Sequence, residues 1–159
     1  MNRITKNSVL VIVTFLFITA FNSKEMNQEK YKEIKIETLK KGPFKYYQAE
    51  IQTVKGLEGA IYLNDTKLLD IEKSHSDQLS SNQAQDLITN GTNEIRLEIS
   101  SINEDIKKDY FSECVAFIAI HGVSEKIFPS KETQIIRVKW NPEKNQKTAY
   151  IKYVFELKR

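Results

Sequence analysis

The sequence of 159 residues has a single cysteine, Cys114, and few residues that interrupt regular structure, with five glycines and three prolines. One cysteine excludes an internal disulfide framework and a zinc site built from several thiolates. Lysine and arginine number 24 against 21 acidic residues, a formal charge of +3, and they form no basic run. The charge pattern therefore gives no support for nucleic-acid binding.

Several catalytic motifs are also missing. The chain has no Gly-x-Ser-x-Gly elbow and neither of the glycine-rich loops that hold phosphate. Cys114 and His121 are seven residues apart, which puts their side chains on opposite faces of a continuous strand. His75 lies in a polar stretch without two-histidine zinc spacing, so we interpret it as a solvated loop residue. We expect no catalytic residue, no metal site and no cofactor, and therefore no enzyme.

The N-terminal segment has the layout of a secretory signal peptide. Arg3 and Lys6 precede an uninterrupted apolar run over residues 9–18, and polar residues begin at Asn22. The run is shorter than the roughly twenty residues that span a membrane. Residues 1–20 are predicted to be a signal peptide cleaved after Ala20, which makes the protein secreted or periplasmic with no membrane span after cleavage. An uncleaved N-terminal anchor is the alternative.

The rest of the chain reads as one nearly neutral domain. Removal of Arg3 and Lys6 with the signal lowers the formal charge from +3 to +1. Residues 21–33 are almost entirely polar and predict a tether. With 40% hydrophobic residues overall, the chain is too apolar to be disordered throughout. We therefore assign residues 34–159 to a single domain.

Alternation of apolar and polar residues dominates this domain and predicts strands. The clearest case is Glu94–Ile99, in which every odd position is apolar and every even one charged. The continuously apolar Cys114–Ile120 predicts a central strand buried on both faces, and Asn64-Asp65 predicts a hairpin turn. Further strands are expected at 35–39, 47–53, 60–63, 68–71, 135–140 and 149–157, with single helical turns around 82–88 and 102–111. This pattern predicts an all-β fold, an antiparallel β-sandwich of jelly-roll or immunoglobulin-like type with about seven or eight strands.

Residues 60–99 resemble a segment of galactose-binding-like (jelly-roll) β-sandwich modules. The residues that carry the resemblance end one strand and lead into another through a Gly-x-Asn turn: Leu63, Asn64, Gly91, Asn93, Ile95 and Leu97. Asp65 departs from the pattern, because these modules usually have glycine there. The resemblance implies a sandwich fold and a binding role. Independently of it, Asn64, Gly91 and Asn93 suit turns and backbone hydrogen bonds, so we expect structural roles for them.

The sequence leads to two main hypotheses about function, which differ in the class of ligand. The preferred one is an exported, non-catalytic protein-binding or accessory module, such as an inhibitor or immunity-type protein, whose partner is an extracytoplasmic protein. The alternative is a carbohydrate-binding module that stacks a glycan on an aromatic side chain, with Tyr46, Tyr62, Tyr150 and Trp140 as candidates. Tyr62 and Tyr150 stand out because each has the opposite parity from the apolar residues of its strand. An uncharacterised hydrolase is a third hypothesis, which would need Asp70, His75 and a distant acid to meet in one cleft.

Overall fold

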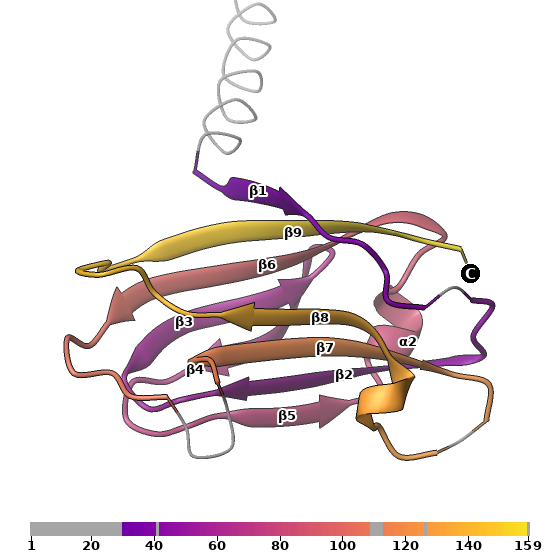
Figure 1. Ribbon diagram of the computed structural model, residues 1–159, viewed down its shortest axis with the longest axis horizontal. Helices are drawn as coiled ribbons and strands as arrows, with labels where there is room; N and C mark the ends of the chain where they lie inside the picture. The colour runs from indigo at the N-terminus through magenta and orange to yellow at the C-terminus, as the bar shows by residue number, and fades with distance from the viewer. Residues whose placement is uncertain (1–29, 41, 109–112, 126, 159) are drawn as a thin grey trace, which may run out of the picture. The chain divides into compact units, whose positions relative to one another are not determined.

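The computed structural model describes residues 30–40, 42–108, 113–125 and 127–158, and Glu33–Arg159 forms one compact unit. The predicted signal peptide and most of the predicted tether lie outside the described residues. The described elements, in chain order, are β1 (Lys32–Lys35), β2 (Tyr46–Thr53), β3 (Leu57–Leu63), β4 (Thr66–Ile71), β5 (Gln78–Ser81), α2 (Ala84–Leu87), β6 (Gly91–Ile102), β7 (Ala116–Val123), the 3-10 turn η1 (Lys131–Thr133), β8 (Gln134–Trp140) and β9 (Ala149–Leu157) (Figure 1).

The strands form two sheets, as the all-β prediction requires. The five-stranded sheet has the order β1-β9-β6-β3-β4, and the four-stranded sheet has the order β5-β2-β7-β8. The pairs β2–β5, β2–β7, β3–β4, β3–β6, β6–β9 and β7–β8 are all antiparallel. Both sheets contribute to a single cluster of buried apolar residues. The architecture is therefore that of a β-sandwich in its coarse form.

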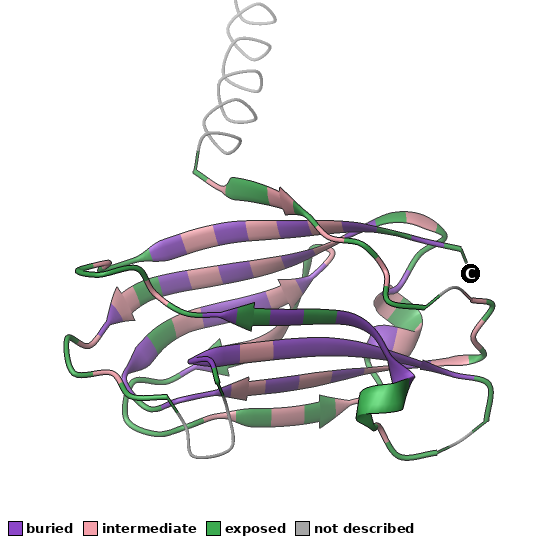
Figure 2. Cartoon of the chain, viewed as in Figure 1, coloured by how far each residue is buried: buried purple, intermediate pink, exposed green. Residues whose placement is uncertain are grey.

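Period-two alternation explains how each sheet obtains its buried face. Burial alternates residue by residue along β2, β6 and β9 (Figure 2). In β6 the buried residues include Ile95, Leu97 and Ile99, whereas the charged residues between them are half-buried. Complete burial of one such side chain contributes about 1.5–3 kcal/mol to folding. The alternating sequence thus determines which face of each strand enters the core.

The central strand β7 lacks this alternation and is buried along most of its length. It lies between β2 and β8, and only Phe117 is half-exposed among its eight residues. The prediction of a central strand buried on both faces is confirmed, although the strand begins at Ala116 rather than Cys114. Cys114 itself is buried, as a small apolar residue would be.

Three local predictions differ from the structure. The polar strand β5 is unforeseen, because an edge strand of four residues has no apolar alternation to reveal it. Strand β1 spans Lys32–Lys35 rather than 35–39, so it begins within the last residues of the predicted tether. The backbone N–H of Leu39 donates instead to the carbonyl of Ile135. The turn expected around 82–88 is α2, whereas residues 103–108 contain no helix, and 109–112 lie outside the described residues. The described part of the chain thus has nine strands rather than seven or eight.

Candidate functional site

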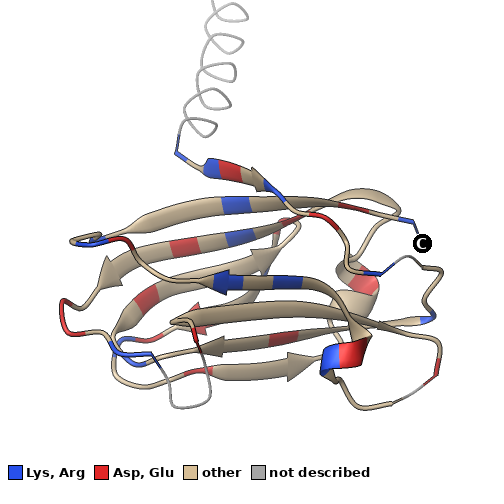
Figure 3. Ribbon diagram, in the orientation of Figure 1, with Lys and Arg blue, Asp and Glu red and all other residues tan. Residues whose placement is uncertain are grey.

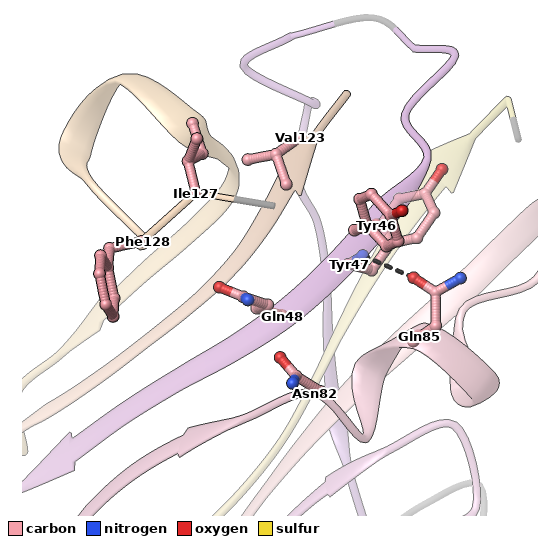
Figure 4. A pocket seen from close by; sticks show the side chains of 8 residues that line it. All are labelled: Tyr46, Tyr47, Gln48, Asn82, Gln85, Val123, Ile127 and Phe128. Carbon is pink, nitrogen blue, oxygen red and sulfur yellow. Dashed lines mark hydrogen bonds between the residues drawn. The ribbon is translucent and has the colours of Figure 1, made fainter. Parts of the chain in front are cut away.

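A cleft of about 460 Å³ lies where β2 begins, β7 ends and α2 starts. Two of its walls come from the neighbouring strands β2 and β7, a third from the segment of α2, and the last from the loop after β7. Eight side chains line it: Tyr46, Tyr47, Gln48, Asn82, Gln85, Val123, Ile127 and Phe128 (Figure 4). None of these eight residues is charged. The cleft is therefore neutral, with an aromatic and aliphatic lining interrupted by three carboxamides.

The loop wall exposes apolar surface to solvent. Phe128 is 93% exposed and Ile127 is 49% exposed. Leu39 is the third large apolar residue exposed in the described chain, and it does not line the cleft. Two of the three exposed large apolar residues of the described chain thus belong to one hollow. Figure 4 shows both side chains on the opposite side of the cleft from Tyr46.

The wall of the cleft formed by Tyr47 is supported by packing against β7. The Tyr47 ring, almost wholly buried, meets Phe44 edge to face with ring centroids 6.2 Å apart. Phe44 in turn covers Gly122, where an added Cβ would stand 2.6 Å from the Phe44 ring. Glycine is thus required at Gly122 for Phe44 to approach the strand, because any larger residue would displace the ring that supports Tyr47.

The three carboxamides of the cleft differ in how their hydrogen bonds are used. Gln85 accepts from the backbone N–H of Tyr47 at 2.8 Å and donates to the carbonyl of Lys45 at 3.4 Å, which fastens α2 to β2. Gln48 Oε1, in contrast, is buried and has no partner among the described residues. An unpaired buried acceptor costs about 1–3 kcal/mol, so it is an unusual feature in a folded protein. Its side chain points from β2 toward the side of the cleft occupied by Phe128 (Figure 4).

A buried polar cluster lies beside Gln48 on the same sheet. His121 is opposite Gln48 in the β2–β7 register and has 1% of its surface exposed. Its Nε2 lies 3.0 Å from Glu50 Oε2, and its Nδ1 lies 2.8 Å from Thr133 Oγ1. Both ring nitrogens are therefore engaged, as expected for an imidazole closed off from water.

Thr133 links this cluster to the loop that carries Phe128. Its hydroxyl lies 2.9 Å from the carbonyl oxygen of Ser130 and 2.9 Å from the backbone nitrogen of the same residue. Ser130 is two residues beyond Phe128, so the His121–Thr133–Ser130 chain fixes the base of the loop wall. The ring of His121 has neither exposed surface nor a free nitrogen, and its position suits support rather than acid–base chemistry.

The aromatic candidates from the sequence lie in different places. Trp140 is 6% exposed within the core and offers no ring face for stacking. Tyr62 and Tyr150 are half-buried on the outward side of the five-stranded sheet, where charged residues of both signs alternate along β6 (Figure 3). The guanidinium of Arg96 lies 4.8 Å from the Tyr62 ring centroid and covers one of its faces. Tyr46 alone among the four lines the cleft.

The three residues expected to have structural roles surround one turn. Asn93, 1% exposed, accepts from the backbone N–H of Thr89 at 2.8 Å and donates to the carbonyl of Gly91 at 2.9 Å. Asn64, with φ of 44°, donates to Asn93 Oδ1 at 3.0 Å. Asn64 also bonds the carbonyl of Leu87 and the N–H of Glu94. Gly91 has φ of 97°, a conformation that glycine adopts without strain. These contacts tie the β3–β4 turn to the end of α2 and the start of β6.

The residues considered for chemistry do not assemble into one site. Cys114 precedes β7, whereas both nitrogens of His121 face Glu50 and Thr133. His75 is exposed and lies 3.1 Å from Asp77, while Asp70 pairs with Lys67 instead. Across the described ranges, no three histidine, cysteine or acidic residues are arranged to hold a metal ion.

The sequence interpretation missed the cleft, although it named Tyr46. The signal that could have revealed it is the apolar pair Ile127-Phe128 within the polar segment Ser124–Thr133. A search among family models, characterised proteins and solved structures finds no match to this chain. Among the residues that the structure describes, no helix has the length and apolar character to cross a membrane.

Proposed function

We propose that this protein is a non-catalytic binding module whose partner is another protein, and that the cleft between β2, β7 and α2 is its binding site. The proposal includes export by residues 1–20 and a sandwich of jelly-roll or immunoglobulin-like class. The observation that carries it is the exposure of Phe128 and Ile127 on the wall of a neutral cleft. Aromatic residues are enriched in protein interfaces, where a few large side chains supply most of the binding energy.

The physical advantage of burying this wall is substantial. A large apolar side chain gains about 1.5–3 kcal/mol when it moves from water into a packed environment. Phe128 has most of its surface still available for that gain, because it is 93% exposed in the isolated chain. The fixed base of the loop at Ser130 and Thr133 limits the ordering that binding would require. A preformed apolar anchor of this kind favours a protein partner.

A carbohydrate ligand is the second candidate, favoured by one specific feature. The half-buried ring of Tyr46 lies in a neutral cleft that also contains the carboxamides of Asn82 and Gln48. Aromatic rings with neighbouring amides can stack and hydrogen-bond a sugar. Most of the lining is apolar, however, and Gln85 has both carboxamide ends engaged. The protein partner therefore remains the better-supported function.

Site-specific photo-cross-linking tests the proposal. The photoreactive analogue p-benzoylphenylalanine replaces Phe128 in the full-length protein, which is expressed in its native host and irradiated. We expect a discrete protein adduct, which mass spectrometry identifies. The matched control places the same analogue at Leu39, the exposed apolar residue outside the cleft.

Comparison of labelling at Phe128 with labelling at Leu39 decides the outcome. An adduct that forms at Phe128 and not at Leu39, and that disappears when Ile127→Ser is added, supports a protein partner at the cleft. Equal labelling at both positions, or labelling of lipid or glycan alone at Phe128, would refute the proposal.

A further inference from the structure

The unmatched acceptor of Gln48 gives information about what occupies the cleft. Gln48 Oε1 is buried without a hydrogen-bond partner among the described residues. Gln85 bonds Tyr47 and Lys45, and Gln52 donates to Glu50 at 3.0 Å. A buried acceptor that no group of the described chain satisfies is suited to a hydrogen-bond donor supplied from outside.

The acceptor is able to reach such a donor. The terminal torsion of a glutamine side chain has broad minima, so the carboxamide turns at little cost. The side chain extends from β2 toward the space in front of Phe128 (Figure 4). The occupant therefore meets an apolar wall at Phe128 and Val123 and an oxygen acceptor at Gln48 within one cleft.

We infer that the cleft binds an uncharged, extended peptide segment that packs an apolar side chain against Phe128 and donates one backbone N–H to Gln48 Oε1. This inference rests on the proposed function, since it names the part of a protein partner that enters the cleft. A backbone amide beside an apolar side chain supplies one hydrogen-bond donor for Gln48 Oε1 and one apolar group that packs against Phe128.

Charge and polarity distinguish this occupant from the others. None of the eight lining residues is charged, so a charged side chain entering the cleft would lose its hydration without an opposite charge among those residues in return. A sugar brings several hydroxyl groups, and most would face Val123, Ile127 and the aromatic rings unpaired. A hydrocarbon chain would leave Gln48 Oε1 unsatisfied. A peptide segment with one inward N–H avoids all three losses.

Binding of capped tripeptides to the full-length protein tests this inference. The probes are Ac-Gly-Phe-Gly-NH2, its Asp analogue, and three forms of the Phe peptide methylated on one backbone nitrogen at a time. Chemical-shift titrations of 15N-labelled protein give the dissociation constants. We expect the Phe peptide to shift the resonances of Tyr46 and Phe128 and the Asp peptide to bind at least tenfold more weakly. One of the three methylated peptides should also lose about tenfold, the usual effect of one hydrogen bond.

Variants of the protein locate the acceptor. Gln48→Met keeps the length of the side chain and removes its amide, and it should weaken the Phe peptide by about the same factor. The sensitive methylated peptide should lose nothing further on this variant, because both changes remove one hydrogen bond. Gln52→Met is the matched control, four residues along the same strand face and outside the cleft, and should bind as the wild type does.

The outcomes separate this inference from the proposed function. Equal binding of all methylated peptides, or unchanged affinity of Gln48→Met, overturns the inference. That result leaves the proposed function intact if p-benzoylphenylalanine in place of Phe128 still captures a protein. Saturable binding of neutral oligosaccharides or of phospholipid vesicles at the cleft, without peptide binding, also overturns it. The methylated peptides act on the unaltered protein, so the test does not depend on any variant folding.

Discussion

Each sheet has a polar cluster on its outward face, and the two clusters differ in how deeply their central side chains, Arg96 and His121, are buried. On the five-stranded sheet, Arg96 Nη1 lies 2.9 Å from Asp65 and 3.3 Å from Glu94, and Lys152 lies 3.1 Å from Glu94. The side chains of Arg96, Glu94 and Lys152 are 19–29% exposed, and charges of both signs alternate there (Figure 3). On the four-stranded sheet, His121 is 1% exposed between Glu50 and Thr133.

The difference concerns water, which reaches the side chain of Arg96 and does not reach that of His121. Charges that remain partly hydrated can pair with one another in several arrangements, and a pair of this kind contributes about 0–1 kcal/mol. The imidazole of His121, which is 1% exposed, has no water to replace a missing partner, so its geometry is fixed and each unmet group around it matters. The row that contains His121 also includes Gln48 and Gln134, each with a buried oxygen that no described residue satisfies. Gln48, His121 and Gln134 thus lie next to one another in a single row of paired residues across β2, β7 and β8.

The comparison predicts its largest effect at His121. His121→Ala removes a buried imidazole together with its contacts to Thr133 Oγ1 and Glu50 Oε2, so we expect a loss of about 2–4 kcal/mol in the free energy of unfolding. Urea denaturation measures this loss, and 15N spectra should show changes at Ile127 and Phe128, because Thr133 holds the base of that loop. A loss no larger than that of Arg96→Ala would contradict the contrast between the two faces.

The inner side of the five-stranded sheet gives the next effect, at alkaline pH. Burial raises the pKa of Tyr153 to about 12 from an ordinary value of 10.0. The unfolded chain therefore releases this proton first, and the stability from the neutral phenol is complete below pH 10 and is lost as the pH rises toward 12. The difference of two pH units corresponds to about 3 kcal/mol at most.

Urea denaturation between neutral pH and pH 11 tests this expectation. Wild type should lose stability over this range faster than Tyr153→Phe, which has no proton to release. Parallel curves for the two proteins would show that burial of Tyr153 does not shift its titration. Because Tyr153 faces the core opposite Ile95, the effect belongs to the inner face and not to the charged cluster.

The charged cluster itself predicts a smaller effect that depends on salt. Arg96→Ala removes contacts with Asp65 and Glu94 and the stacking on Tyr62, for an expected loss of about 1 kcal/mol. The difference from wild type should shrink as the salt concentration rises from low to molar, because partly exposed charges are screened. The loss in His121→Ala should stay nearly constant over the same range. Equal salt dependence of the two variants would remove the distinction between a hydrated and a buried cluster.

Local pattern was sufficient to predict most of the fold. The alternation at Glu94–Ile99 correctly separates the two faces of β6, and the continuous apolar run identifies β7 as a central strand. Strand β5 could not be found in this way, because Gln78–Ser81 has a single apolar residue, Leu79, and pairs as an edge strand with β2. Propensity is weak for such an edge strand, and tertiary pairing determines its structure.

The site was less predictable than the fold, since it depends on relations between distant segments. Gln48 and His121 are more than seventy residues apart in sequence, and their adjacency arises only from the register of β2 with β7. The half-burial of Tyr62 under Arg96 depends likewise on the pairing of β3 with β6. The exposure of Phe128 depends on the path of the loop between β7 and η1. The sequence shows only that an apolar residue lies in a polar segment.

The smallest predicted effect on stability concerns Phe128 and gives the clearest sign of a binding role. Phe128→Ser removes an apolar side chain that is 93% exposed, so little apolar contact within the chain is lost. We expect the free energy of unfolding to change by no more than about 0.5 kcal/mol, measured by urea denaturation. The same substitution at a buried apolar position such as Ile118, on the neighbouring strand β7, should cost several times more. A large loss in the free energy of unfolding of Phe128→Ser would mean that the ring packs within the fold. The cleft would then have no exposed aromatic side chain available to a partner.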